Sequence, residues 1–174
     1  MKTKIEIIKG DITKQKVDAI VNAANTSLRG GGGVDGAIHL AAGPELLEYN
    51  IKLGSCPTGE VRLAPGFKLP AKYIIHTVGP IWNGGENNED ILLANCYKNS
   101  LTLASDNKFK SVAFPSISTG IYRFPLERAV NIALTETKKF LPRNDELEKI
   151  VFVCFDERTR EVYNKVFDKI FGIM

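Results

Sequence analysis

The chain has 174 residues, of which 44% are hydrophobic and 25% are charged, the make-up of one globular domain over residues 1–174. The longest uninterrupted apolar run covers residues 150–155, far short of the ~20 residues that a membrane-spanning helix needs. The first residues lack the apolar core of a signal peptide. We therefore expect a cytoplasmic protein that does not engage a membrane.

Lys and Arg number 23 against 20 Asp and Glu, for a net charge of +3. This excess is too small to predict a dedicated nucleic-acid surface, although it does not exclude a polyanionic partner. The three cysteines are widely spaced and His39 and His76 are the only histidines, so the sequence predicts no metal site and no disulfide framework. We expect any chemistry to depend on carboxylates, amides or the backbone, without a cofactor.

Hydrophobic periodicity predicts strands and helices that alternate along most of the chain. The expected strands cover residues 4–8, 19–23, 60–64, 73–78, 111–115 and 149–155. The expected helices cover residues 34–42, 44–53, 89–105, 126–141 and 157–171. This alternation predicts an α/β fold, a three-layer α/β/α sandwich.

The first expected strand is followed by Gly10, Asp11 and Ile12. At this position the Asp11 carboxylate could accept a hydrogen bond from the exocyclic amine of a base. It could equally cap the next turn of the chain.

The second expected strand ends in two carboxamides, Asn22 and Asn25, and a glycine run, Gly30 to Gly33, then opens a helix. Glycines let a ligand approach the backbone N–H groups, and these groups together with the positive end of the helix form a cradle for phosphate. A flexible surface turn is the alternative. The run matches neither the Rossmann pattern nor the P-loop, which argues against nicotinamide and ATP chemistry.

Asp35 lies in the first turn of that helix, where the helix dipole stabilises a negative charge. We expect it to be ionised with a pKa near the usual ~3.9, and therefore to orient a water rather than to deprotonate it fully. A plain helix-terminal carboxylate is the alternative. His39 follows four residues later on the same helix face and is expected to support Asp35.

A second strand-to-helix loop covers residues 116–125. In open α/β sheets, ligands bind beyond the carboxyl ends of the strands, so this loop and the glycine run should face one crevice. Ser118, Thr119 and the Gly120 backbone could hold a diphosphate, and Tyr122 could cover a sugar. A hydroxyl-capped turn and a half-buried packing tyrosine are the alternatives.

Phe155 ends the last expected strand, where its ring could stack on a base, although a core position is the simpler interpretation. His76 and Trp82 are expected to support the crevice by packing. Cys56 is expected to be an unreactive loop thiol.

Four motifs together strongly resemble the macrodomain family, in particular its MacroD-type branch; they are Gly10 to Thr13, Ile20 to Asn25, Gly30 to His39, and Ile117 to Tyr122. Residues 56–59, 76–80 and 154–156 extend the similarity over nearly the whole chain. The resemblance implies a mixed six-stranded sheet that binds ADP-ribose. It also implies a hydrolase acting on O-acetyl-ADP-ribose and on proteins mono-ADP-ribosylated at Asp or Glu.

The resemblance also implies roles for individual residues. Asp11 and the Ile12 backbone would hold the adenine amine, with Phe155 beside the base. The diphosphate and distal ribose would be enclosed by two loops, made of Gly32, Gly33 and Val34, and of Ser118, Thr119, Gly120, Ile121 and Tyr122. Asn25 would bind the ribose, Asn22 would brace the loop, and Asp35 would be the catalytic carboxylate, sharing its task with a substrate phosphate.

Arg123 departs from the family pattern, which often has glycine after the loop tyrosine. Two other functions are open at this point. A non-catalytic ADP-ribose reader would keep the cradle without needing Asp35, and a regulatory protein associated with RNA or a ribonuclease would bind RNA in a salt-sensitive manner.

Overall fold

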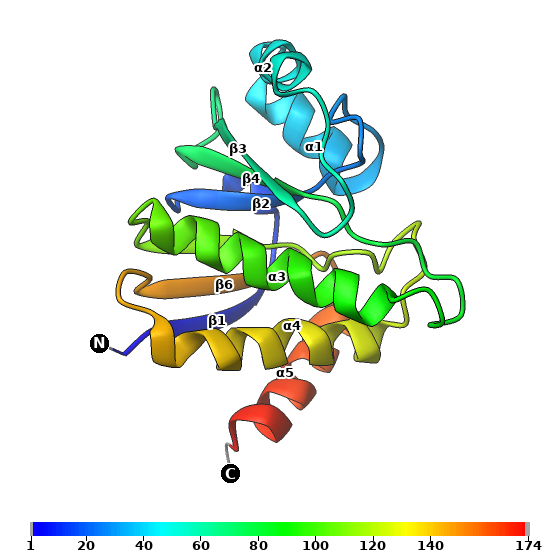
Figure 1. Cartoon of the computed structure of the whole chain (residues 1–174). Coiled ribbons are helices and arrows are strands. Elements are labelled where there is room, and N and C mark those ends of the chain that lie inside the picture. Colours follow the sequence, from blue (N-terminus) through cyan, green and yellow to red (C-terminus); the bar gives the residue numbers. More distant parts are fainter. Residues whose placement is uncertain (1, 173–174) are drawn as a thin grey trace.

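The computed structural model describes residues 2–172 of the chain. Figure 1 shows a sheet with helices on both of its faces. The strands are β1 (Lys4–Lys9), β2 (Ala19–Ala23), β3 (Val61–Pro65), β4 (Tyr73–Thr77), β5 (Ser111–Phe114) and β6 (Lys149–Cys154). The α-helices are α1 (Gly33–Ala42), α2 (Glu45–Leu53), α3 (Glu89–Asp106), α4 (Leu126–Phe140) and α5 (Glu157–Phe171), with short 3-10 turns at Ile12–Lys14 and Leu141–Arg143.

The six strands form one sheet in the order β1-β6-β5-β2-β4-β3. Every neighbouring pair is parallel except β3 and β4, which are antiparallel. The expected mixed six-stranded sheet and three-layer sandwich are therefore confirmed. Because β1, β6, β5, β2 and β4 run in the same direction, the chain leaves all five at one edge of the sheet, which we call the carboxyl edge.

Successive side chains along a strand point to opposite faces of the sheet, so the residues they contact show which helices cover each face. Ile20, Ile74 and Ala113 point to one face and pack with residues of α1 and α2. Val21 and Phe114 point to the other and join a larger core with residues of α3, α4 and α5. Since both faces are buried, the central strands are nearly continuous apolar runs.

Within residues 2–172, no helix is long and apolar enough to cross a membrane. The same part of the chain contains no group of three or more His, Cys, Asp or Glu side chains arranged to hold a metal ion.

Candidate functional site

Asp35 lies on the buried side of α1, together with Ile38 and Ala42, and is only 5% exposed. Its Oδ1 accepts a hydrogen bond of 2.8 Å from Asn22 Nδ2, and His39 Nε2 lies 3.5 Å from the same oxygen. His39 therefore lies beside Asp35 as expected, but its Nε2 makes no hydrogen bond among the described residues. A methyl group placed on Gly31 would lie 3.3 Å from the other oxygen, Oδ2, so this oxygen is oriented toward the glycine loop.

Burial raises the pKa of Asp35 above its ordinary value, while the hydrogen bond from Asn22 and the nearby His39 ring act in the opposite direction. The expectation of an unperturbed carboxylate is therefore wrong. The first-turn position favours a low pKa, but removal of the carboxylate from water outweighs it. A raised pKa makes Asp35 a stronger base than a surface aspartate.

The structure corrects the expected role of Asn22. Its side chain is fully buried, so it has no exposed surface for a substrate, and it binds Asp35 instead of bracing the loop. Asn22 shares a strand face with Ile20, because side chains alternate along β2, and it therefore lies beneath α1.

Asn25 is the residue that braces the glycine loop. Its Nδ2 donates to the Gly30 carbonyl at 2.8 Å, and its Oδ1 accepts from Ser27 Oγ at 2.7 Å and from Leu28 N at 3.1 Å. Nδ2 carries a second hydrogen. The nitrogen itself would lie 3.4 Å from a methyl group on Gly31. Asn25 and Asp35 thus flank the same small space.

The glycine loop lies directly against the first turn of α1. A Cβ on Gly36 would come within 2.5 Å of the Gly31 carbonyl oxygen, so this approach requires glycine in the helix. Gly32 and Gly33 are exposed and Val34 is half-buried, which leaves the backbone at the helix start open to a ligand. The braced loop argues against the alternative of a flexible turn.

The loop after β5 crosses the end of β2 and reaches the end of β4. A Cβ on Gly79 would lie 2.1 Å from Ser118 Oγ, although β2 separates β4 from β5 in the sheet. Ser118 is buried, with a φ of 66°, and Thr119 Oγ1 bonds Ser116 Oγ at 2.8 Å. The hydroxyl-capped turn is therefore present at Thr119, and it shapes the loop.

The outer part of this loop is exposed. Ile121 is 83% exposed, and Tyr122 is half-buried and accepts a backbone hydrogen bond of 2.9 Å from Trp82 N. Arg123 has a φ of 60°, in the left-handed region that favours glycine.

Asp11 and Phe155 lie at the far end of the carboxyl edge, where Gly10 N donates to the Cys154 carbonyl at 3.0 Å. Asp11 Oδ1 accepts from Thr13 N at 2.9 Å and from Thr13 Oγ1 at 2.6 Å, so the capping interpretation is correct for this oxygen. The Ile12 side chain is buried. Phe155 is 87% exposed, which rules out the core position and leaves its ring free to stack.

Sequence reasoning missed the polar contacts of His76 and Asn50. His76 is fully buried and hydrogen-bonds the side chains of Asn22 and Asn50, both at 3.1 Å, so it does more than pack. The sequence signal for His76 is its two-residue spacing from Ile74, which puts both side chains on one strand face. Only the structure shows that His76 lies opposite Asn22 in the sheet. Cys56 lies in a loop, as expected, and is buried there, which raises its pKa.

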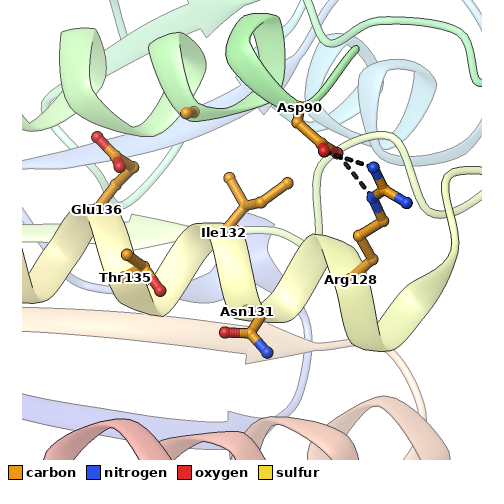
Figure 2. A pocket seen from close by; sticks show the side chains of 7 residues that line it. Asp90, Arg128, Asn131, Ile132, Thr135 and Glu136 are labelled. Carbon is orange, nitrogen blue, oxygen red and sulfur yellow. Dashed lines mark hydrogen bonds and ion pairs between the residues drawn. The ribbon is translucent and has the colours of Figure 1, made fainter. Parts of the chain in front are cut away.

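A separate surface hollow of about 350 Å³ lies between α3 and α4 (Figure 2). Its rim carries an ion pair in which Arg128 Nε donates to Asp90 at 2.8 Å, and Arg128 also lies 4.9 Å above the Trp82 ring. None of the residues expected to bind a substrate lines this hollow, so the carboxyl edge is the candidate site.

Comparison with known proteins identifies the family of this chain. Residues 21–133 match the family model described as Macro domain. A Methanosarcina mazei macro domain-containing protein is 57% identical over 167 residues, covering 96% of this chain and 89% of that protein. An Escherichia fergusonii protein named O-acetyl-ADP-ribose deacetylase is 54% identical over 170 residues, covering 95% and 96%.

The fold comparison gives the same result. The solved structure of the Oceanobacillus iheyensis macrodomain with ADP matches with a TM-score of 0.93 at 47% identity, over 99% of this chain and 94% of that chain. With most of the chain matched in sequence and nearly all of it in structure, this protein belongs to the macrodomain family.

Proposed function

We propose that this protein binds ADP-ribose and hydrolyses the acetyl ester of O-acetyl-ADP-ribose. One observation carries the proposal: the buried Asp35 carboxylate has one oxygen tied to Asn22 and the other oriented toward Gly31 and Asn25. The relative named as a deacetylase and the macrodomain with ADP support the same activity and ligand.

The candidate residues follow the carboxyl edge in an order that suits an elongated nucleotide sugar. Asp11 follows β1, Phe155 follows β6, the loop of Ser118 to Tyr122 follows β5, and Asn25 follows β2. These four strands are consecutive in the sheet. Three inter-strand spacings amount to about 14 Å. We place adenine on Phe155, the diphosphate between the two loops at residues 32–34 and 118–122, and the distal ribose beside Asn25 and Asp35.

In this mechanism Asp35 Oδ2 accepts a proton from a water as that water attacks the carbonyl carbon of the acetyl group. The bond between this carbon and the ribose oxygen breaks, and Asp35 returns the proton to the ribose oxygen. The product leaves as acetic acid, which ionises to acetate in water. The raised pKa of Asp35 suits it for accepting the proton, and orientation supplies much of the remaining rate because the ester is already labile.

The same chemistry extends to a second class of substrate. An Asp or Glu side chain linked to ADP-ribose is also an ester of a ribose hydroxyl, so we include proteins mono-ADP-ribosylated at Asp or Glu among the substrates. A linkage to serine or arginine is not a carboxylic ester, and we expect it to resist hydrolysis.

The test incubates the purified protein with O-acetyl-ADP-ribose and with Glu-, Asp-, Ser- and Arg-linked ADP-ribosylated peptides, and measures released ADP-ribose. Asp35→Ala should lower turnover about 100-fold or more, with ADP-ribose affinity by calorimetry within about tenfold. Asp168→Ala removes an exposed carboxylate of α5 and serves as the control. A wild-type protein that binds ADP-ribose and hydrolyses none of these esters would be a reader, and the proposal would fail.

A further inference from the structure

A chain of four buried hydrogen bonds leads from Leu28, in the loop between β2 and α1, to Asp35. Asn50 Nδ2 donates to the Leu28 carbonyl at 3.0 Å, and Asn50 Oδ1 lies 3.1 Å from His76 Nε2. His76 Nδ1 in turn lies 3.1 Å from Asn22 Nδ2, which donates to Asp35 at 2.8 Å. The four bonds join the loop, α2, β4, β2 and α1.

The fold brings these residues together on one face of the sheet. Asn22 and His76 are paired in the register of β2 and β4, and they share the face of Ile20 and Ile74, which packs against α1 and α2. These two helices lie beside each other at this end of the sheet (Figure 1). Asn50 is fully buried on α2.

The chemistry of the acceptors fixes the direction of every bond. The Leu28 carbonyl can only accept, so Asn50 must present its Nδ2 there and its Oδ1 to His76. His76 Nε2 must then carry the hydrogen, which leaves Nδ1 of the neutral ring as an acceptor. Asn22 therefore presents Nδ2 to Nδ1, and the second hydrogen of Nδ2 goes to the carboxylate of Asp35.

The orphan oxygen of Asn22 is explained by the same logic. Asn22 Oδ1 is buried without a hydrogen-bond partner among the described residues, an arrangement that costs free energy and that turning the amide over would not relieve. Turning over would place this oxygen against the carboxylate oxygen of Asp35. The ring stays neutral at physiological pH because burial lowers the pKa of His76 to about 4.

We infer that Asn50 and His76 are positioning residues: they hold the Asn22 amide in the orientation that donates to Asp35. The inference rests on the proposed hydrolase function for its catalytic consequence, but the hydrogen-bond relay itself does not. Neither residue needs to touch the substrate. Loss of the relay should change the orientation and the pKa of the Asp35 carboxylate while leaving the ADP-ribose site intact.

The experiment compares His76→Phe with His76→Gln. Phenylalanine keeps the ring but removes both nitrogens, whereas the glutamine amide carries one acceptor and one donor and can restore both contacts. Asn50→Ala breaks the relay one step further away and provides a second test if His76→Phe does not fold. Thr137→Val, which removes a buried hydroxyl of α4, is the control for a general loss of stability.

For His76→Phe and Asn50→Ala we expect kcat on O-acetyl-ADP-ribose to fall about tenfold or more. KM and the Kd for ADP-ribose should stay within about threefold. The acid limb of the kcat profile should move to higher pH, because the bond from Asn22 lowers the pKa of Asp35. His39 is the titratable group beside this carboxylate, and its ring centroid lies 6.5 Å from that of His76. His76→Gln should recover most of kcat.

The inference is overturned if folded His76→Phe keeps the wild-type kcat and acid limb, or if His76→Gln loses as much as His76→Phe. An inactive wild-type protein would instead refute the proposed function. The relay would then be tested by ¹³C NMR titration of the Asp35 carboxyl group, where His76→Phe should raise its pKa and an unchanged pKa would refute the relay.

Discussion

Gly31→Ala offers a direct test of the space between Asp35 and Asn25. The added methyl carbon would lie 3.3 Å from Asp35 Oδ2 and 3.4 Å from Asn25 Nδ2. A water that donates to Oδ2 must place its oxygen about 2.6–3.2 Å from that atom. The methyl group therefore occupies the position that the reacting water needs.

The folded state should tolerate this change. Gly31 has an ordinary backbone conformation, outside the left-handed region, and Gly→Ala at such a position stabilises by about 0.4–1 kcal/mol through the unfolded chain. A contact of 3.3 Å offsets part of this gain. We expect the free energy of unfolding to change by less than about 1 kcal/mol, equivalent to a Tm shift within about 4 °C.

Turnover should respond quite differently from stability. We expect Gly31→Ala to lose about 100-fold or more in kcat on O-acetyl-ADP-ribose, measured alongside Tm by calorimetry. Gly10→Ala, whose methyl group makes ordinary contacts at 3.8 and 3.9 Å, is the matched control and should keep its kcat. If Gly31→Ala retains its Tm and the wild-type kcat, the reacting water does not lie between Asp35 and Asn25.

Two further predictions concern Phe155, at the adenine end of the candidate site, and Glu89, at the start of α3. Phe155→Ala should weaken ADP-ribose binding about tenfold by loss of base stacking with little change in Tm, because the ring is 87% exposed; unchanged affinity in calorimetry would remove Phe155 from the site. Glu89 accepts from the backbone N–H groups of Asn83, Gly85 and Asn87, and these bonds lower its pKa to about 2. A lowered folded-state pKa contributes stability that is complete above the unfolded value of 4.5 and is lost as the pH falls toward 2. Glu89→Gln should therefore flatten the decline of Tm over that range, and an unaltered decline would contradict the role of Glu89.

Much of the fold could be predicted because it depends on two features of the local sequence, the hydrophobic pattern within each element and the residues that separate the elements. Buried strands such as β2 appear as short apolar runs, and the amphipathic helices are separated from them by glycine, proline and polar residues. The expected elements agree with the structure to within one or two residues. One difference is that β6 ends at Cys154 rather than at residue 155, where the next side chain is exposed to solvent.

The site could be predicted in its position but not in its side-chain contacts. Loops after parallel strands meet at one edge, so the loops after β2 and β5 could be placed together from the order of elements alone. The roles of Asn22 and Asn25 could not, because they depend on which side chain α1 covers. Asn50 carried no signal at all, since a polar residue on a short helix is usually exposed and only the packing of α2 buries it.

Asp35 shows how position and burial oppose each other in determining a pKa. A carboxylate in the first turn of a helix is stabilised as an anion by about 0.3–1 kcal/mol, which favours a low pKa. Burial disfavours the same anion, and in Asp35 burial has the larger effect, even against the hydrogen bond from Asn22. Since the sequence reveals the helix start but not the depth of the carboxylate, it predicts only the smaller influence. The base proposed for this reaction therefore depends on the tertiary packing of α1 over β2, and a substitution that exposes Asp35 without removing it should lower its pKa and its catalytic power together.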